Sequence, residues 1–555
     1  FFFFCVDGLF FRWSIPAYGC IPIPPMVEEV QTDRTRSEIS ERSRASAVTA
    51  RCTVHLHDLS FLRGTTSAVL LEGFGQILRA TTGGIGSVTD GANDYWKSEA
   101  VDSGQLDLFL SHSWHACWWQ KYLTLLFYFN AWPATLAVIV VAVIWCILQY
   151  NLLCRCLWGW RWRGFLPMSL VFIAVLFSWH HLRATLRKQS WIFLDKVCID
   201  QQDAERKTRG IKSIGGILHC SKTLLVAWDR SYFTRLWCTF ELAAFLHSQP
   251  EGRVVCLPII LGRVTSEIAL CTWTMELLRV YMGIWARTVA FFVVSLAFAI
   301  RFHDFLEEVE DLSSDLLHFE ARKAECFCCS NGHCHPTTNQ KLSCDRKLVE
   351  GSIAHWYGSG NVEEGLARFD ELIRGQFRDQ IREVFRGARM PYHLILVSSV
   401  WPAMHQLDYI VEDCQATATT RLARCLRCAH IMFIGFPLVF AILMATMKLL
   451  VKVRILNKCA RTILFAATNC CLHWVSIASG RFISSTANSG QTMHLVLCIL
   501  LLLSQSFLVF YFFQDGKRQT VKLARRIKEL RLTPPWREME VELASVTAAA
   551  AEGRG

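Results

Sequence analysis

Several common signals are missing from this chain of 555 residues. It has no Asn-x-Ser/Thr sequon, so native N-glycosylation cannot report which segments face the outside of a membrane. A glycine-rich stretch at residues 81–91 lacks Gly-Lys-Ser/Thr and follows no predicted strand, which favours a flexible connector over a phosphate-binding loop. No nucleic-acid-binding motif accompanies the net charge of +11, and we expect no nucleic-acid partner.

Charged residues are also scarce, at 19% of the chain, whereas hydrophobic residues reach 52% and the mean hydropathy is +0.28. About 20 apolar residues in a helix cross the hydrocarbon core of a bilayer. Six runs meet this length, at residues 122–153, 164–182, 280–300, 428–447, 462–480 and 493–513. The sequence therefore predicts an integral, multi-pass membrane protein in contact with the lipid bilayer.

Between these runs, short apolar segments bounded by polar turns predict buried parallel strands. The first is residues 106–111, and two more, 192–195 and 224–228, follow beyond the first two membrane-length runs. Helix-like stretches at 211–219 and 236–247 complete a βαβα alternation, which predicts a doubly wound α/β domain. The two inserted runs form a hairpin, because an even number of crossings returns the chain to the side on which the sheet must close.

Three motifs follow these strands in a fixed order. The first strand ends in Phe-Leu-Ser at Ser111, and the second ends in an acidic turn at Asp195 and Lys196. The third precedes a Tyr…Trp-Cys-x-x-Glu-Leu pattern made by Tyr232, Trp237, Cys238, Glu241 and Leu242. Together they resemble the Toll/interleukin-1 receptor (TIR) domain. The resemblance covers residues 106–111 and 191–261, and it implies a flavodoxin-like parallel sheet that associates with other TIR-like domains through the loop at 197–209.

Many TIR domains cleave NAD at the bond between nicotinamide and ribose, and the resemblance implies that Glu241 is the catalytic residue. A carboxylate beside the ribose would stabilise the oxocarbenium-like charge that develops as nicotinamide leaves. The cleft at the carboxyl ends of the strands would be lined by Ser111, Trp114, Asp195, Lys196 and Trp237. The alternative is that Glu241 is an ordinary polar residue of a surface helix and that the domain only binds other TIR domains.

Lysine- and arginine-rich flanks indicate the orientation. With six spans, the basic segments 183–188, 448–461 and 517–528 fall on the side of the α/β domain, which we expect to be cytosolic, although basic residues at 155–163 and 421–427 break the rule. The region 301–427 then lies on the opposite side, where its acidic beginning is suited to a non-cytosolic face. Within it, residues 362–389 predict an amphipathic helix packed on this region or on a membrane, and 390–407 an interfacial or re-entrant segment.

The same region holds the densest cluster of metal-binding residue types, Cys326, Cys328, Cys329, His333, Cys334, His335 and Cys344. A zinc ion bound by Cys326, Cys328, Cys329 and Cys334 is one interpretation. Disulfides are a second, suited to an exofacial region, and unlinked loop cysteines are a third. The spacing is not a standard CxxC pair, and we expect no metal centre and no bound cofactor.

The predicted organisation has seven parts. They are a largely disordered tail at 1–105, a TIR-like domain at 106–121 and 183–265, an inserted hairpin at 122–182, a transmembrane helix at 280–300, a Cys-rich and amphipathic region at 301–427, three transmembrane helices at 428–513 and a basic cytosolic tail at 514–555. The most suitable function is a membrane-bound signalling or self-association module. The alternatives are a TIR-type NAD nucleosidase and a transporter or channel, for which Asn469 and His473 on one helix face are the best polar pair.

Overall fold

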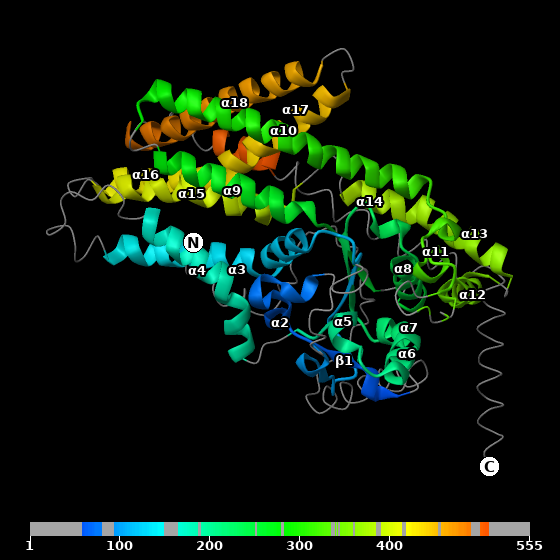
Figure 1. The fold of residues 1–555 in the computed structure, drawn as a ribbon. Helices are drawn as coiled ribbons and strands as arrows, with labels where there is room; N and C mark the ends of the chain where they lie inside the picture. The colour runs from blue at the N-terminus through cyan, green and yellow to red at the C-terminus, as the bar shows by residue number, and fades with distance from the viewer. Residues whose placement is uncertain are drawn as a thin grey trace, which may run out of the picture.

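A small parallel sheet and a bundle of long helices make up the molecule, with the sheet domain at one end of the helices (Figure 1). The computed structural model describes residues 58–79, 94–148, 165–186, 190–249, 252–278, 282–334, 339, 341, 344–358, 361–384, 390–412, 418–452, 457–489 and 500–509. The predicted basic tail at 514–555 lies outside these residues, as does most of the predicted N-terminal tail.

Four parallel strands form the sheet in the order β4-β3-β5-β6, with bounds β3 Leu108–His112, β4 Ile192–Phe193, β5 Thr223–Trp228 and β6 Arg253–Pro258. Phe109 on β3 lies beside Phe193 of β4 and Leu224 of β5, so the predicted pairing of the three strands is confirmed. In chain order the arrangement is 2-1-3-4, which is the order of the first four strands of flavodoxin-like sheets. Every residue of β3 is buried, as expected for a central strand of a parallel sheet.

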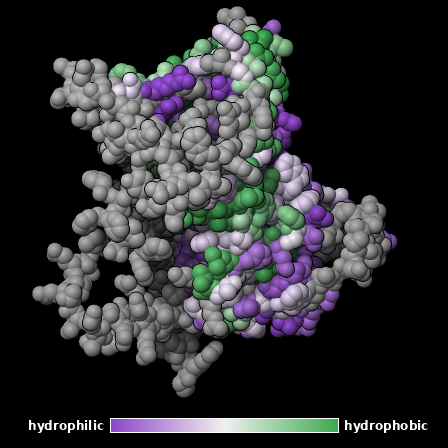
Figure 2. Space-filling view, turned by 90° about the vertical axis from the view of Figure 1, so that its left-hand side faces the viewer, coloured by the Kyte–Doolittle hydropathy of each residue, from purple (hydrophilic) through white to green (hydrophobic). Residues whose placement is uncertain are grey.

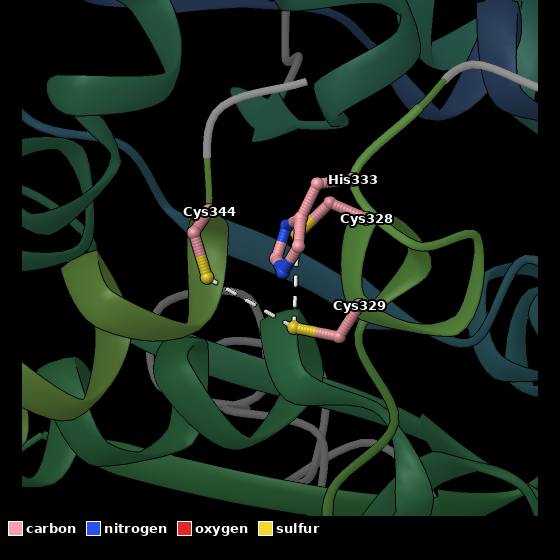
Figure 3. A group of neighbouring side chains, drawn as sticks. All are labelled: Cys328, Cys329, His333 and Cys344. Carbon is pink, nitrogen blue, oxygen red and sulfur yellow. Dashed lines mark hydrogen bonds between the residues drawn. The ribbon is translucent and has the colours of Figure 1, made fainter. Parts of the chain in front are cut away.

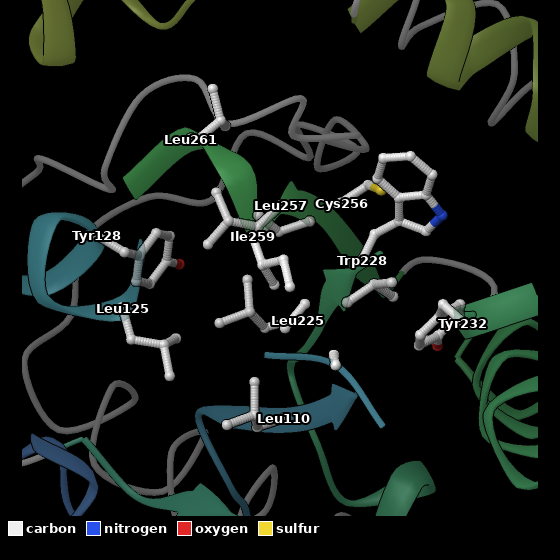
Figure 4. Packing of buried hydrophobic residues seen from close by; sticks show 14 of the residues in the cluster. Leu110, Leu125, Tyr128, Leu225, Trp228, Tyr232, Cys256, Leu257, Ile259 and Leu261 are labelled. Carbon is white, nitrogen blue, oxygen red and sulfur yellow. The ribbon is translucent and has the colours of Figure 1, made fainter. Parts of the chain in front are cut away.

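The sheet and the helix bundle share one hydrophobic core. Leu110 and Leu225 extend from the sheet towards Leu125 and Tyr128 of the helix that follows β3, with Ile259 beside them (Figure 4). All five side chains are buried. Burial contributes about 25 cal/mol per Å² of apolar surface, so this shared core attaches the domain firmly to the bundle.

Short helices connect the strands of the α/β domain, namely α5 Asp195–Cys198, α6 Ala204–Lys212, α7 Ile214–His219 and α8 Leu236–Ser248. The helix-like stretch predicted at 211–219 is divided between α6 and α7 at Ser213. The predicted association loop, residues 197–209, comprises the end of α5, a turn and most of α6. Its residues 201–203 and 207–209 are exposed, and they form a polar projection from the domain.

The bundle contains α3 Trp118–Leu148, α4 Phe165–Thr185, α9 Ile260–Leu278, α10 Ile284–Leu317, α15 Tyr392–Glu412, α16 Ala418–His430, α17 Phe436–Lys452 and α18 Lys458–Ser489. Seen from the ends of these helices, hydrophobic residues gather in a band above a mostly hydrophilic lower part, where the sheet domain lies (Figure 2). Among the described residues, four helices are long and apolar enough to cross a membrane, at Trp118–Trp145, Phe165–Thr185, Trp285–Leu317 and Arg424–Leu450.

Four of the six predicted spans thus correspond to helices that are long and apolar enough to cross a membrane. The run at 462–480 lies in α18, which is not among the four. Of the run at 493–513, the described part is a short apolar helix, Leu500–Val509. The segment predicted as interfacial or re-entrant at 390–407 is instead mostly contained in the continuous helix α15, which packs against α3, α4 and α9.

Helices α3 and α9 begin together at the edge of the sheet. The Thr124 hydroxyl donates to the carbonyl of Ile259 at 2.6 Å and accepts the amide of Gly262 at 2.9 Å. A Cβ on Gly262 would lie 2.3 Å from the backbone nitrogen of Thr124, so only glycine permits this approach. The contact directs α9 out of the domain alongside α3, and the sequence analysis did not assign this helix to the membrane.

The Cys-rich region packs directly on the α/β domain, contrary to the expectation that it lies on the opposite side of the membrane. Arg230 after β5 pairs with Asp311 of α10 at 2.8 Å, and Arg235 before α8 pairs with Glu325 at 3.1 Å. The Tyr357 hydroxyl donates to the carbonyl of Ala243 in α8 at 2.8 Å. Segments that touch in this way lie on one side of a membrane.

Helix α9, which leads from β6 into α10, is not among the four helices that are long and apolar enough to cross a membrane, yet a crossing by α10 would require a second crossing by α9 to keep the contacting segments on one side. Its 19 residues extend about 28 Å at 1.5 Å per residue, close to the hydrocarbon thickness of about 30 Å. Two of its charges are compensated, because Arg263 pairs with Glu267 at 2.9 Å.

Part of the N-terminal segment is ordered, although the sequence predicts a largely disordered tail. It contains β1 Arg63–Gly64, α2 Ser67–Leu71 and β2 Glu99–Ala100. Thr65 exchanges two backbone hydrogen bonds with Ile192, at 2.7 and 2.8 Å, and so covers the outer edge of β4. Leu62, Leu70 and Leu71 are buried, and their burial explains why this part is folded.

The predicted amphipathic helix is a continuous helix made of α13 Val362–Leu372, a π-helical turn Ile373–Phe377 and α14 Arg378–Val384. Residues 385–389 lie outside the described part. Its apolar residues Leu366, Phe369, Ile373, Phe377 and Ile381 are all buried. They pack on α10 and on α12 Asp345–Tyr357, so the helix belongs to this region rather than to a membrane surface.

Candidate functional site

The carboxyl ends of β3 and β5 meet at the point where the order of the strands reverses, which is where open α/β sheets bind ligands. Ser113 follows β3 and Ser231 follows β5, and their hydroxyls lie 2.6 Å apart. Ser231 also donates to the carboxylate of Asp229 at 2.9 Å. The candidate site is built from these two strand ends and from the helices beside them.

Glu241 reaches this edge from α8. Its carboxylate accepts a hydrogen bond of 2.5 Å from the Ser111 hydroxyl, which is also 2.7 Å from the hydroxyl of Tyr232. The Glu241 side chain is buried, with 9% of the residue exposed. Burial raises the pKa of Glu241 to about 8, and the negative charge of Asp195 adds to the rise while the hydrogen bond from Ser111 opposes it. Glu241 is therefore mostly protonated at neutral pH.

Asp195 forms the second acidic position, at the end of β4. Its carboxylate accepts hydrogen bonds from the indole of Trp114 at 3.1 Å and from the backbone amide of Lys196 at 2.7 Å. Burial raises the pKa of Asp195 to about 6, although both hydrogen bonds and the charge of Lys121 oppose the rise. Burial thus raises the pKa of both carboxyl groups, and it raises that of Glu241 further.

A buried lysine that the sequence analysis did not name completes this edge. Lys121, in the first turn of α3, is 1% exposed and donates to the carbonyl of Ser113 at 3.0 Å. Its charge lowers the pKa of Asp229, which burial raises overall. The signal was present in the sequence as the one charged residue at the start of an otherwise apolar run.

The structure brings together four of the six predicted site residues. Ser111, Trp114, Asp195 and Glu241 belong to the strand-end edge. The ammonium of Lys196 instead donates to the carbonyl of Arg79 at 3.2 Å. The indole of Trp237 donates to Asp345 of α12 at 3.4 Å and not to a residue of this edge.

A separate cavity of about 220 Å³ lies within the helix bundle, between α9, α10, α15, α17 and α18. Asn469 and His473, the polar pair singled out in the sequence, both line it. The Asn469 amide donates to the hydroxyl of Ser295 at 2.8 Å, and the His473 ring stacks on Phe291 with centroids 4.4 Å apart. Both residues thus join α18 to α10.

The Cys/His cluster is assembled differently from the predicted set. Cys328, Cys329, His333 and Cys344 lie close together, whereas Cys334 is exposed and outside the group (Figure 3). Cys326 is 3.0 Å from Cys328. His333 and Cys344 belong to the cluster recognised in the sequence but not to the four ligands proposed there.

No family model, curated protein or solved structure matches the chain.

Proposed function

We propose that the protein is a multi-pass membrane protein whose α/β domain is a TIR-like signalling module that associates with its own kind. The observation that carries the proposal is the sheet itself. Three strands with TIR-like motifs pair in parallel in the order β4-β3-β5, and the connection from β3 to β4 runs through two membrane-length helices. A signalling domain attached in this way is held at the membrane in a fixed orientation.

The polar projection at 201–209 is the surface that suits association. It combines exposed Lys207 and Arg209 with exposed Asp203 and Glu205, so two copies can present opposite charges to each other. Arg209 pairs with Glu205 within the helix at 3.6 Å. This surface pair contributes little to stability, on the order of 0.3–0.5 kcal/mol, and both charges remain available to a partner.

Energy transfer between donor- and acceptor-labelled copies of the full-length protein in lipid nanodiscs or vesicles tests the proposal. We expect transfer for the wild type above random encounter, and its loss in the double variant Lys207→Glu with Arg209→Glu. Lys347→Glu, a charge reversal at another exposed helix position, is the matched control and should retain transfer. Wild-type copies that show only random encounter at all surface densities would contradict the proposal.

A second candidate function, NAD cleavage, is supported by the position of Glu241 beside the switch point of the sheet. The protonated carboxyl would have to ionise to stabilise an oxocarbenium-like ribose. The cationic nicotinamide ring of NAD, once bound, would favour the ionised form. Because Glu241 and Ser111 are buried, this edge of the sheet would also have to open to admit the nucleotide.

Nicotinamide release by associated, reconstituted protein tests this second candidate. The rate should rise with pH towards about 8, as the carboxyl ionises. Glu241→Gln should abolish release, and Glu371→Gln, an exposed helix position far along the chain, should leave it unchanged. If wild-type protein releases no nicotinamide although its copies demonstrably associate, NAD cleavage is contradicted and the association function is unaffected.

A further inference from the structure

The cysteine and histidine cluster lies in a tight turn that precedes α12. After the short helix α11 Phe327–Ser330, the backbone amides of Gly332 and His333 donate to the carbonyls of Cys329 and Cys328, at 3.2 and 2.7 Å. Gly332 and His333 both have positive φ, of 59° and 60°. A left-handed conformation is unfavourable for a non-glycine residue, and here it brings the imidazole of His333 back over the two cysteines (Figure 3).

Cys344 reaches the same point from the other side, as the residue that caps the N-terminus of α12. One ligand atom from each of Cys328, Cys329, His333 and Cys344 lies within 4.8 Å of all the others. The Cys329 sulfur is 4.0 Å from that of Cys328 and 3.9 Å from that of Cys344. Two thiolates bound tetrahedrally to zinc at about 2.3 Å stand about 3.8 Å apart, so little movement would complete the array.

We propose that Cys328, Cys329, His333 and Cys344 bind one zinc ion in a closed, structural Cys₃His site. Four protein ligands leave no open position for substrate, which is the difference between a structural and a catalytic zinc site. Three thiolates, one neutral imidazole and Zn²⁺ carry a net charge of −1. The Arg346 guanidinium, which contacts Cys329 and also pairs with Glu350 at 3.2 Å, lies beside that charge.

The neighbouring cysteines do not form a better set. Cys326 and Cys328 are 3.0 Å apart, which is too close for two tetrahedral ligands at about 3.8 Å and too far for a disulfide at about 2.05 Å. A second group, Cys326, Cys328 and Asp345, offers only three ligands. The contacts with α8 also place the cluster on the side of the α/β domain, and if that side is the cytosol, thiols persist there.

The ion would fasten this turn to α12 and, through α12, to α8. Phe240 and His247 of α8 pack on Trp356 of α12, with ring centroids 5.4 and 5.8 Å apart. Zinc binding therefore stabilises the surface on which α8, the helix that carries Glu241, rests. The site does not depend on the proposed signalling function and can be tested without it.

Metal analysis of the purified full-length protein, expressed with zinc and freed of loosely bound ions, is the first test. We expect about one zinc ion per chain, near-complete loss in Cys344→Ser and in His333→Ala, and full retention in Cys334→Ser, which changes an exposed cysteine of the same turn. Wild-type protein without metal, or with metal that survives both ligand substitutions, would overturn the proposal.

Two measurements on wild-type protein avoid dependence on variants that fail to fold. Cobalt in place of zinc should give the visible absorption of tetrahedral Co²⁺ together with thiolate charge-transfer bands. Alkylation followed by mass spectrometry should show Cys334 modified rapidly, and Cys328, Cys329 and Cys344 protected until a chelator is added. An octahedral cobalt spectrum, or equal alkylation of the three cysteines with and without chelator, would contradict the site.

Discussion

The hydroxyl of Ser111 donates a hydrogen bond to the carboxyl of Glu241 across 130 residues of sequence and two membrane-length helices. This single contact joins the end of β3, before the inserted helices, to α8, which follows β5. It also links the first and third of the three sequence motifs, which are separated in the chain by α3 and α4.

Removing the Ser111 hydroxyl should destabilise the α/β domain. Ser111→Ala leaves both the Glu241 carboxyl and the Tyr232 hydroxyl buried without this partner, and an unsatisfied buried polar group costs about 1–3 kcal/mol. Thermal unfolding in detergent should show a lower midpoint than for the wild type. Ser103→Ala, at an exposed serine that bonds only to the nearby carbonyl of Gln105, is the control and should unfold like the wild type.

The stability of the wild type relative to Glu241→Gln should fall as pH rises from 5 to 8. The unfolded state releases the Glu241 proton near pH 4.5, whereas the folded state holds it until about pH 8. Between these values the folded state binds more protons, so each pH unit removes about 1.4 kcal/mol from the wild type and nothing from the glutamine variant.

Thermal midpoints of the two proteins, measured side by side across this pH range, give the difference directly. Other titrating groups contribute to both proteins and largely cancel in the comparison. A difference that stays constant from pH 5 to 8 would mean that Glu241 is ionised in the folded protein at neutral pH, contrary to its burial.

A methyl group on Gly262 should separate α9 from α3. The added Cβ would meet the backbone of α3, which cannot move aside without disturbing the sheet edge. Overpacking of this kind costs about 1–3 kcal/mol, and Gly262→Ala should lower the thermal midpoint. Gly351→Ala in α12 is the matched control, because nothing lies within 4 Å of its added Cβ, and alanine there should stabilise the helix by up to about 1 kcal/mol.

Sequence patterns were sufficient for some elements and not for others. The strands at Phe109, Phe193 and Leu224 were recognisable because a buried parallel strand is apolar on both faces. Helix α9 was missed because Arg263, Glu267 and Glu276 interrupt its apolar pattern. The compensating contacts, an ion pair within the helix and the approach of Glu276 to His405 of α15 at 3.8 Å, exist only in the folded bundle.

The candidate sites were likewise only partly predictable from the sequence, because some of their contacts exist only in the folded protein. Glu241 and Ser111 could be named from motifs, but Lys121 was hidden in an apolar run, and its role depends on the position of Ser113. Trp237 was assigned to the cleft because it lies in the same motif as Glu241. Residues four apart on a helix usually share a face, yet here the indole reaches Asp345 while the carboxyl reaches Ser111. Cys344 joins Cys328, Cys329 and His333 because it lies at the N-terminus of α12, and the sequence did not predict where that helix begins.

The central claim is that the α/β domain and the Cys-rich region form one body on one side of the membrane, with α9 and α10 crossing between them. The absence of native sequons makes glycosylation scanning a direct test. An acceptor sequon with a flexible spacer, inserted at Gly283 between α9 and α10 or at Lys347 in α12, is expressed in cells that glycosylate luminal segments. We expect glycosylation at Gly283 and none at Lys347. Glycosylation at both sites, or at neither, would place them on one side of the membrane and would contradict the crossing of α10 between them.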